Sequence, residues 1–275
     1  MKKRFPAVLI LILLALILFL AGIAIIATPT FNRMKQESLA KDAVAAFLLE
    51  RNTAEVNASA LTENMPRYNF PTKESDVRVE ALPSSPTGSF GRVSYQGLFD
   101  AMKKYNNDLY QTNQRGLSDP WCYTASVFDL GVYGLNSEVI GVLTIPAMKY
   151  EEPVYLGATS EHLSKGAAQL SISSMPIGGV NTNCVLAGHR GWHGALHFRH
   201  IDLLKVGDSV TLINLWDELE YKVAEIKIID PWQTEALLIQ PGRDLLTLIT
   251  CHPYGSGGQY RYLVICERSG TSERR

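Results

Sequence analysis

The chain has 275 residues, of which 46% are hydrophobic, enough for one core domain of ordinary size plus an extension. Its 26 basic and 27 acidic residues give a net charge of -1, which offers no electrostatic reason to bind nucleic acid or another polyanion. These numbers argue against two large domains and against a nucleic-acid-binding protein.

An uncharged apolar run covers residues 7–27, directly after the basic N-terminus MKKR. At about 1.5 Å per helical residue the run spans roughly 30 Å, the thickness of the hydrocarbon core of a bilayer. A secretory signal peptide has a shorter apolar region, and the residues after Ala27 make a poor cleavage site. We therefore expect an uncleaved, single-pass membrane anchor, with residues 1–6 in the cytoplasm and the body of the chain outside the cell. A cleaved signal and a buried core helix are the weaker alternatives.

A helical and loop-rich extension is predicted between this anchor and the rest of the chain, over residues 28–116. Apolar residues recur at helical spacing over 37–52 and again over 95–114, where an Arg-Gly pair follows as a stop signal. The stretch 61–94 carries four prolines among scattered Ser, Thr and Gly. We predict that this stretch is a linker without long regular elements.

From residue 138 the chain changes to short β-branched runs separated by turns. Seven such runs with polar, Gly- or Pro-bearing connections favour an antiparallel β-barrel or sandwich over alternating βα units. The predicted strands are 139–145, 153–156, 184–187, 209–214, 219–229, 245–250 and 260–266.

A cysteine and an arginine stand at the facing ends of the last two runs. Cys251 ends TLITC (247–251), and Arg261 begins the next run. Two strands joined by the intervening loop would place these residues side by side. A thiol becomes a nucleophile when part of it is thiolate, which a base or a positive charge promotes, and the oxyanion that forms needs a donor. On their own, a strand-end cysteine is more often a packing residue and a strand-start arginine a solvated edge charge.

A candidate base, His189, lies in LAGHRG (186–191), where the glycines favour an exposed turn. A histidine in such a turn is more often a plain surface residue. The other cysteines are Cys122, Cys184 and Cys266, and no two cysteines have CxxC spacing. Nothing in their pattern indicates a metal knuckle or a disulfide framework.

A competing pattern is HRGWHGALHFRH, which spaces His189, His193, His197 and His200 so that an ideal helix would align three imidazoles for zinc. The glycines in this stretch break the helix that the alignment needs, and no glutamate occupies a general-base position. The sequence therefore favours the thiol site over a zinc site.

Together these motifs resemble the sortases, the membrane-anchored cysteine transpeptidases of Gram-positive bacteria. TLITC with Arg261 matches their strand-end signature, and LAGHRG matches their histidine motif. IGVLTIP (140–146), SKGAAQL, PIGG (176–179) and LLKVGDSV (203–210) follow in the family's order. The resemblance covers residues 95–266.

The resemblance implies a mainly β fold, an eight-stranded sortase barrel with short helices over 124–268 and a polar tail over 269–275. It also implies a thiol-protease type of chemistry without a metal or cofactor. Cys251 would attack the threonine carbonyl of an LPxTG-like sorting signal, Arg261 would stabilise the oxyanion, and His189 would protonate the departing glycine amine.

SDPW (118–121) is by itself only a turn signal, but it resembles the lid of the class C, pilin-polymerising sortases. The resemblance implies a lid over 117–123, with Asp119 near the catalytic arginine and Trp121 near the cysteine. Class C members commonly carry a second apolar segment at the C-terminus, where this chain has the polar ERSGTSERR. Thr250, beside the nucleophile, would orient the arginine or the substrate, or serve only as a strand residue.

Membership of class C implies that a lysine amine of another pilin subunit resolves the thioester, giving an isopeptide bond and a growing pilus. The expected partners are proteins with LPxTG-like sorting signals, an acceptor pilin lysine and the lipid bilayer. Two alternatives stay open: a housekeeping sortase that joins surface proteins to peptidoglycan precursor, and an inactive scaffold of pilus assembly.

Overall fold

The structure is a computed structural model that describes residues 7–63, 95–114, 126–135, 137–192, 194–255 and 257–270. Its helices are α1 (Ala7–Glu63), α2 (Gln96–Gln111) and α3 (Ser160–Lys165), with short 3-10 turns η1 (Leu130–Tyr133), η2 (Pro146–Met148), η3 (Ile201–Leu203) and η4 (Thr234–Leu237). Its strands are β1 (Val139–Ile145), β2 (Tyr150–Leu156), β3 (Ala167–Gln169), β4 (Thr182–Ala187), β5 (Ser209–Asn214), β6 (Glu218–Ile229), β7 (Asp244–His252) and β8 (Tyr260–Arg268).

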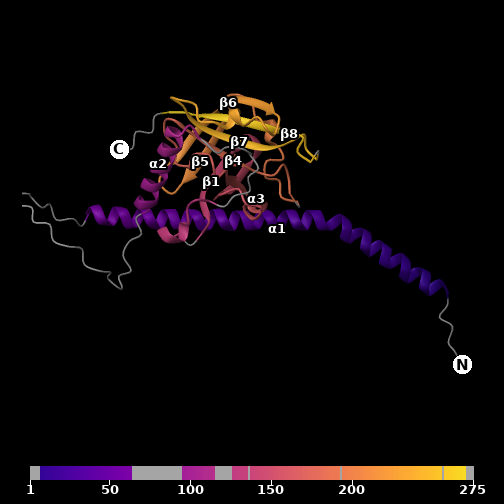
Figure 1. The fold of residues 1–275 in the computed structure, drawn as a ribbon. Coiled ribbons are helices and arrows are strands. Elements are labelled where there is room, and N and C mark those ends of the chain that lie inside the picture. Colours follow the sequence, from indigo (N-terminus) through magenta and orange to yellow (C-terminus); the bar gives the residue numbers. More distant parts are fainter. Residues whose placement is uncertain are drawn as a thin grey trace, which may run out of the picture.

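The eight strands close into a barrel in the order β1-β2-β3-β4-β7-β8-β6-β5 (Figure 1). This confirms the predicted mainly β barrel. The expectation of purely antiparallel pairing is wrong at two places, because β2 pairs with β3 in parallel and β4 pairs with β7 in parallel. Parallel neighbours need a crossover connection, which α3 provides for the first pair and the segment containing β5 and β6 for the second.

The barrel interior is filled by aliphatic side chains. Every residue of β4 is buried, and so are the six residues from Leu245 to Thr250 in β7. Strands that are covered on both faces are nearly continuous apolar runs, which is why β4 and β7 do not alternate between apolar and polar residues. Each large aliphatic side chain buried in this way contributes roughly 1.5–3 kcal/mol of transfer free energy. The strand that ends at Cys251 is therefore anchored along nearly its whole length.

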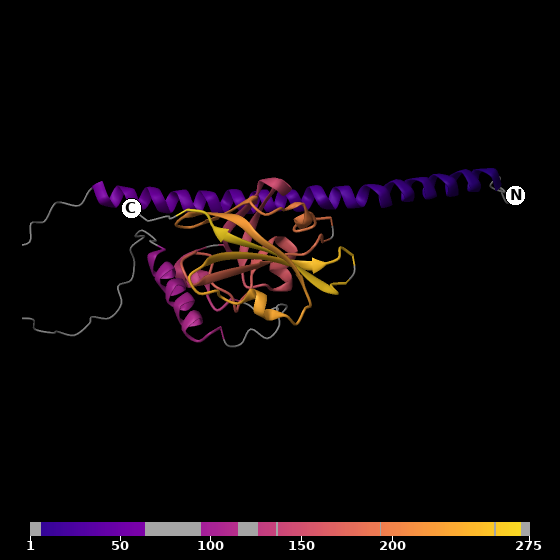
Figure 2. The same cartoon turned by 90° about the horizontal axis from the view of Figure 1, so that it is seen from above.

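The long helix α1 runs beside the barrel and joins the apolar run to the predicted helix over 37–52 in one element (Figures 1 and 2). Val44 and Phe47 bury their side chains against the barrel. The N-terminal part bends away from the barrel (Figure 1), and Pro29, a residue type that kinks helices, lies inside α1. By length and composition α1 is able to cross a membrane, and its apolar run is exposed.

The second helix, α2, confirms the helical periodicity predicted over 95–114, although it ends at Gln111. It buries Leu98, Phe99 and Met102. Tyr95, just before α2, donates a hydrogen bond to Glu50 of α1 at 3.2 Å. The predicted linker 61–94 falls, after residue 63, outside the described residues.

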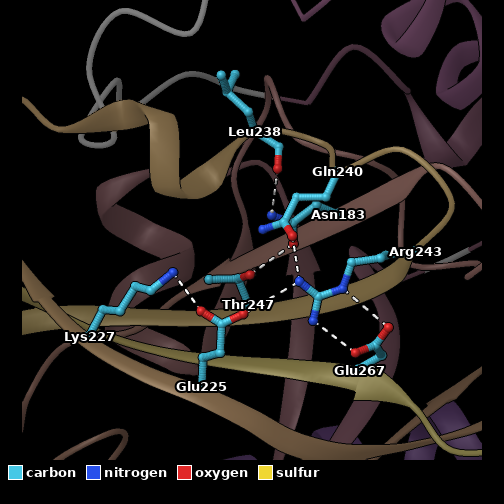
Figure 3. A network of polar contacts seen from close by, with 8 residues as sticks. All are labelled: Asn183, Glu225, Lys227, Leu238, Gln240, Arg243, Thr247 and Glu267. Atoms are coloured by element: carbon cyan, nitrogen blue, oxygen red, sulfur yellow. Dashed lines mark hydrogen bonds and ion pairs between the residues drawn. The ribbon is translucent and has the colours of Figure 1, made fainter.

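A network of polar contacts joins β4, β6, β7 and β8 near the start of β7 (Figure 3). Arg243 binds Glu267 through Nε at 3.1 Å and Nη2 at 2.8 Å, and it also contacts Glu225 at 3.4 Å. Thr247 donates to the Asn183 side-chain oxygen at 2.8 Å. These bonds satisfy the polar groups at this end of the barrel and tie the four strands together.

Candidate active site

The last two strands, β7 and β8, bring Cys251 and Arg261 together. They form an antiparallel ladder in which Cys251 is the register partner of Arg261. Directly opposed residues in such a ladder have Cβ atoms about 4.5–5.5 Å apart. The side-by-side placement predicted for these two residues is therefore confirmed.

Gly258, in the loop between the two strands, lies close to both side chains. A Cβ atom at this glycine would lie 3.1 Å from Arg261 Nη1 and 3.2 Å from Cys251 Sγ. The glycine also has φ +90°, a conformation that L side chains rarely adopt. Glycine at this position leaves room around the sulfur and the guanidinium, which a larger side chain would fill.

The guanidinium of Arg261 is oriented by backbone carbonyl groups. Its Nη1 donates to the carbonyl oxygens of Gly258 at 2.6 Å and Tyr260 at 3.2 Å, and the residue is 8% exposed. Carbonyl oxygens accept these bonds without a formal negative charge. These two hydrogen bonds hold the guanidinium in place beside Cys251.

The electrostatic environment of Cys251 differs from that of the other described cysteines. Burial raises the pKa of its thiol, and the positive charges of Arg261 and Arg190 act in the opposite direction. Burial raises the pKa of Cys266 to about 12 and that of Cys184 further, with Asp244 adding to the latter effect. Cys251 is thus the described thiol that combines partial exposure with two nearby cations.

His189 follows β4, which pairs with β7 in parallel so that Ala187 is the register partner of Ile249. The ladder continues past the strand, because the amide of Gly188 donates to the carbonyl of Ile249 at 3.1 Å. His189 therefore begins a turn at the same end of the barrel as Cys251. Its ring stacks on Trp192, with ring centroids 4.3 Å apart and an interplanar angle of 12°.

Thr250 connects β7 to this turn. Its hydroxyl donates to the carbonyl of Gly188 at 2.7 Å, and the residue is fully buried. Gly188 itself has no room for a side chain, since a Cβ would lie 2.7 Å from the ring of Phe198. Thr250, which precedes Cys251 in the sequence, thus contacts the turn that presents His189.

Sequence reasoning missed a second arginine at this end of the barrel. Arg190 is buried, and its Nη1 lies 2.6 Å from Nδ1 of His252, while its Nη2 lies 3.2 Å from a carboxylate oxygen of Asp202. A guanidinium only donates, so Nδ1 of His252 is the acceptor in this contact. Arg190 also lies over the ring of Tyr262, 5.5 Å from its centroid.

The sequence positions of Arg190 and His252 gave no indication that the two side chains are in contact. Arg190 follows His189 and His252 follows Cys251, but neighbouring residues in extended chain point to opposite sides. Arg190 and His252 meet only because β4 and β7 run in parallel, a pairing that the sequence pattern did not predict.

The histidines of the competing zinc pattern do not lie on a helix in the described part of the chain. The described residues from 188 to 200 form turns and an isolated bridge, without a helix. His197 lies 2.7 Å from Glu152 through Nδ1, and His189 is stacked on Trp192. Among the described residues no group of three or more metal-ligating side chains converges; His193 is outside them.

The lid predicted over 117–123 lies outside the described residues, and with it lie Asp119, Trp121 and Cys122. The described part of the site therefore consists of the β7–β8 ladder end, the turn after β4 and the Arg190 cluster.

Comparisons of the sequence with known proteins agree on one family. The family model described as Sortase domain matches residues 143–269. Sortase D of Bacillus subtilis is 31% identical over 135 residues, which cover 48% of this chain and 65% of that protein. Sortase A of Listeria monocytogenes is 32% identical over 175 residues, which cover 61% of this chain and 76% of that protein. The chain thus spans less than two thirds of the length of the Bacillus relative.

Solved structures with the same fold carry class C names. Sortase C1 of group B Streptococcus pilus island 1 is 31% identical with a TM-score of 0.59, covering 68% of this chain and 88% of that one. Clostridium perfringens sortase C, solved with the C-terminal cell wall sorting motif, is 34% identical with a TM-score of 0.54. That alignment covers 64% of this chain and 90% of the other.

Proposed function

The chain belongs to the sortase family, and from this premise we propose that it is a cysteine transpeptidase of class C. Cys251 is the nucleophile, Arg261 the oxyanion donor and His189 the proton donor. The observation that carries the proposal is the register pairing of Cys251 with Arg261 beside the turn that bears His189.

In the first half-reaction the Cys251 thiolate attacks the carbonyl carbon of threonine in an LPxTG-like sorting signal. The carbonyl oxygen gains negative charge, and the guanidinium of Arg261 stabilises it. The bond between that carbon and the glycine nitrogen then breaks, and His189 gives a proton to the departing amine. The product is a thioester on Cys251.

In the second half-reaction an amine attacks the thioester, the carbon–sulfur bond breaks, and the thiolate returns. The attacking amine loses a proton, for which the neutral imidazole of His189 is the acceptor, so the catalyst is restored. We propose a pilin lysine as the acceptor because the structural neighbours include pilus-related class C enzymes of group B Streptococcus. Another neighbour, the sortase C of Clostridium perfringens, was solved with a cell wall sorting motif. The product is an isopeptide bond between pilin subunits.

A second acceptor is the alternative. The curated relatives include enzymes named Sortase A and Sortase D, so a housekeeping role, with peptidoglycan precursor as the amine, uses the same first half-reaction. Incubating the preformed thioester with a lysine-bearing pilin peptide and, separately, with a peptidoglycan-type amine distinguishes the two. Faster consumption by the second amine would overturn the pilin assignment.

We further propose that α1 anchors the chain in the membrane, with residues 1–6 in the cytoplasm and the barrel outside the cell. The support is the length and exposure of the apolar part of α1 and the basic residues before it. Protease added to intact cells digests the barrel if this orientation holds, and protection of the barrel would reverse it.

The chemistry is tested by mass spectrometry of the full chain incubated with a sorting-signal peptide. The expected result is an acyl adduct on Cys251 that is absent in Cys251→Ala and present in Cys184→Ala and Cys266→Ala. Product formation by the Cys251→Ala chain would disprove the nucleophile. Absence of any adduct or hydrolysis with every sorting-signal peptide, in a chain from which the predicted lid has been deleted, would favour the scaffold alternative.

A further inference from the structure

The turn that presents His189 also touches the helix that we propose as the membrane anchor. A Cβ atom on Gly194 would lie 3.0 Å from the backbone nitrogen of Arg33 and 3.3 Å from the carbonyl oxygen of Pro29. Gly194 also has φ +97°, so a glycine here permits both the turn and the close approach of the two backbones. The loop after β4 therefore rests on one particular turn of α1.

That turn of α1 lies just beyond the apolar run. The run ends at Ala27, and Arg33 is six residues further along the helix. At a rise of 1.5 Å per residue the two positions are about 9 Å apart along the axis. The hydrocarbon core of a bilayer is about 30 Å thick and the whole bilayer about 40–45 Å, so each headgroup layer is roughly 5–8 Å deep. The loop meets α1 at the outer margin of that layer.

The side chains exposed at this end of the barrel are those that proteins place at membrane interfaces. Trp192 is 39% exposed and Tyr254 is 54% exposed. The guanidinium of Arg199 lies 4.7 Å from the centroid of the Tyr254 ring, and a Cβ atom on Gly191 would lie 3.4 Å from that ring. Trp, Tyr and Arg combine an apolar body with a polar or charged tip, which suits the boundary between headgroups and acyl chains.

The direction of the loops agrees with this placement. The loop between β7 and β8, which contains Tyr254, extends toward the side on which the N-terminal part of α1 leaves the barrel (Figures 1 and 2). A cavity of about 790 Å³ lies instead at the other end of the barrel, between α2 and the beginning of β7. The end that carries Cys251 thus faces the membrane side, and the cavity lies away from it.

We propose that Trp192, Arg199 and Tyr254 form a lipid-facing surface that binds the headgroup layer of the bilayer in which α1 is embedded. This holds the mouth of the active site at the membrane surface. The proposal rests on the membrane anchoring given under the proposed function, and it requires no catalytic step. The proposed ligand of this surface is lipid. The test below distinguishes lipid binding from binding of a substrate protein to the same surface.

The test uses the full chain reconstituted into vesicles of phosphatidylcholine and phosphatidylglycerol (3:1) in which the acyl chains are brominated near the headgroups. One variant, Trp121→Phe/Trp216→Phe/Trp232→Phe, keeps Trp192. A matched variant, Trp121→Phe/Trp192→Phe/Trp232→Phe, keeps Trp216, which packs on Phe99 of α2 at the opposite end of the barrel. Brominated lipid should quench the fluorescence of the first variant at least twofold more than that of the second.

Equal quenching in the two variants would overturn the proposal. So would quenching of Trp192 that appears only after a membrane-bound sorting-signal protein is added, because that result assigns the surface to the substrate. Adding Arg199→Gln and Tyr254→Ser to the first variant should reduce quenching at least twofold, whereas adding Lys227→Gln, an exposed change on β6, should leave it unchanged.

The readout needs no catalysis, so its failure is distinct from failure of the proposed chemistry. A chain that forms the thioester but shows no preferential quenching of Trp192 refutes the surface alone. A chain whose Trp192 is quenched but which forms no thioester refutes the chemistry alone. Flotation of the chain with the vesicles tests the anchor separately.

Discussion

Two arginines, at opposite ends of the ladder between β7 and β8, are held in different ways. Arg243, just before β7, is bound by the carboxylates of Glu267 and Glu225 (Figure 3). Arg261, opposite Cys251, is oriented by the carbonyl groups of Gly258 and Tyr260. The first arrangement pairs a guanidinium with carboxylates, and the second places a guanidinium beside a thiol.

The two arginines shift the pKa values of different kinds of neighbouring group. The hydrogen bond and ion pair with Arg243 lower the pKa of Glu267, and those with Lys227, followed by those with Arg243, lower the pKa of Glu225. Near Cys251 the arginine charge instead opposes the increase in thiol pKa that burial causes. One residue type therefore lowers the pKa of carboxyl groups at one end of the ladder and opposes the rise of a thiol pKa at the other.

The largest effect is expected from Arg261→Gln, which removes the proposed oxyanion donor. Loss of one such donor lowers the rate of the chemical step by about 10²–10³-fold. Single-turnover acylation by a sorting-signal peptide measures this loss. Arg243→Gln is the matched control, and its acylation rate should stay within a factor of two of the wild type. A similar loss in both variants would show that fold stability, and not the donor, sets the rate.

A smaller effect is expected in the reactivity of Cys251 toward iodoacetamide. Because burial raises the thiol pKa, alkylation of the wild-type chain should keep increasing with pH above 9.0. Arg190→Gln removes a positive charge, so the pKa rises further and the rate at pH 7 falls by about tenfold for each pKa unit. Mass spectrometry of Cys251 follows the reaction. A pH profile that does not move in Arg190→Gln would rule out an electrostatic role for Arg190.

A few-fold loss of acylation is expected for Thr250→Val, which keeps the β-branched shape but removes the hydroxyl. The carbonyl of Gly188 then loses its 2.7 Å donor in a buried position, at a cost of about 1–3 kcal/mol. Thr247→Val, three residues earlier in the same strand, is the control for stability alone. If the two variants lose stability equally and Thr250→Val acylates normally, Thr250 does not position the His189 turn.

The smallest effect is expected from Arg243→Gln on stability, about 1 kcal/mol or less, since its ion pairs are partly exposed. The lowered pKa values of Glu225 and Glu267 mean that this stabilisation is present above the ordinary carboxyl value of 4.5 and is lost as pH falls below it. Melting temperatures of wild type and variant should therefore differ by about 2–4 °C at pH 7 and converge near pH 3. A constant difference over that range would contradict the ion-pair explanation.

Much of the barrel could be predicted from local pattern. The strands 139–145 and 209–214 coincide with β1 and β5, and the other five predicted strands lie within observed ones. The short strand β3 was missed because Ala-Ala-Gln has neither β-branched residues nor alternation. The two parallel pairs were missed because register between distant segments depends on tertiary packing.

The site could be predicted only where it depends on strands that are neighbours in the sequence. The pair of Cys251 and Arg261 spans one hairpin, so its geometry follows from neighbouring strands. The position of His189 and the contact of Arg190 with His252 depend on the parallel pairing of β4 with β7, which joins residues more than 60 positions apart. Family resemblance supplied the first of these relations but not the second.

The position of β7 in the barrel also determines which parts of the site are able to move. Both edges of β7 are hydrogen-bonded, to β4 as far as Ile249 and to β8 through Cys251. Amides in such a strand exchange with solvent chiefly when the whole domain opens, whereas turns exchange through small local openings. The sulfur is therefore the fixed reference point of the site. Adjustments during turnover fall to the glycine-containing turns around it, which open at lower free energy.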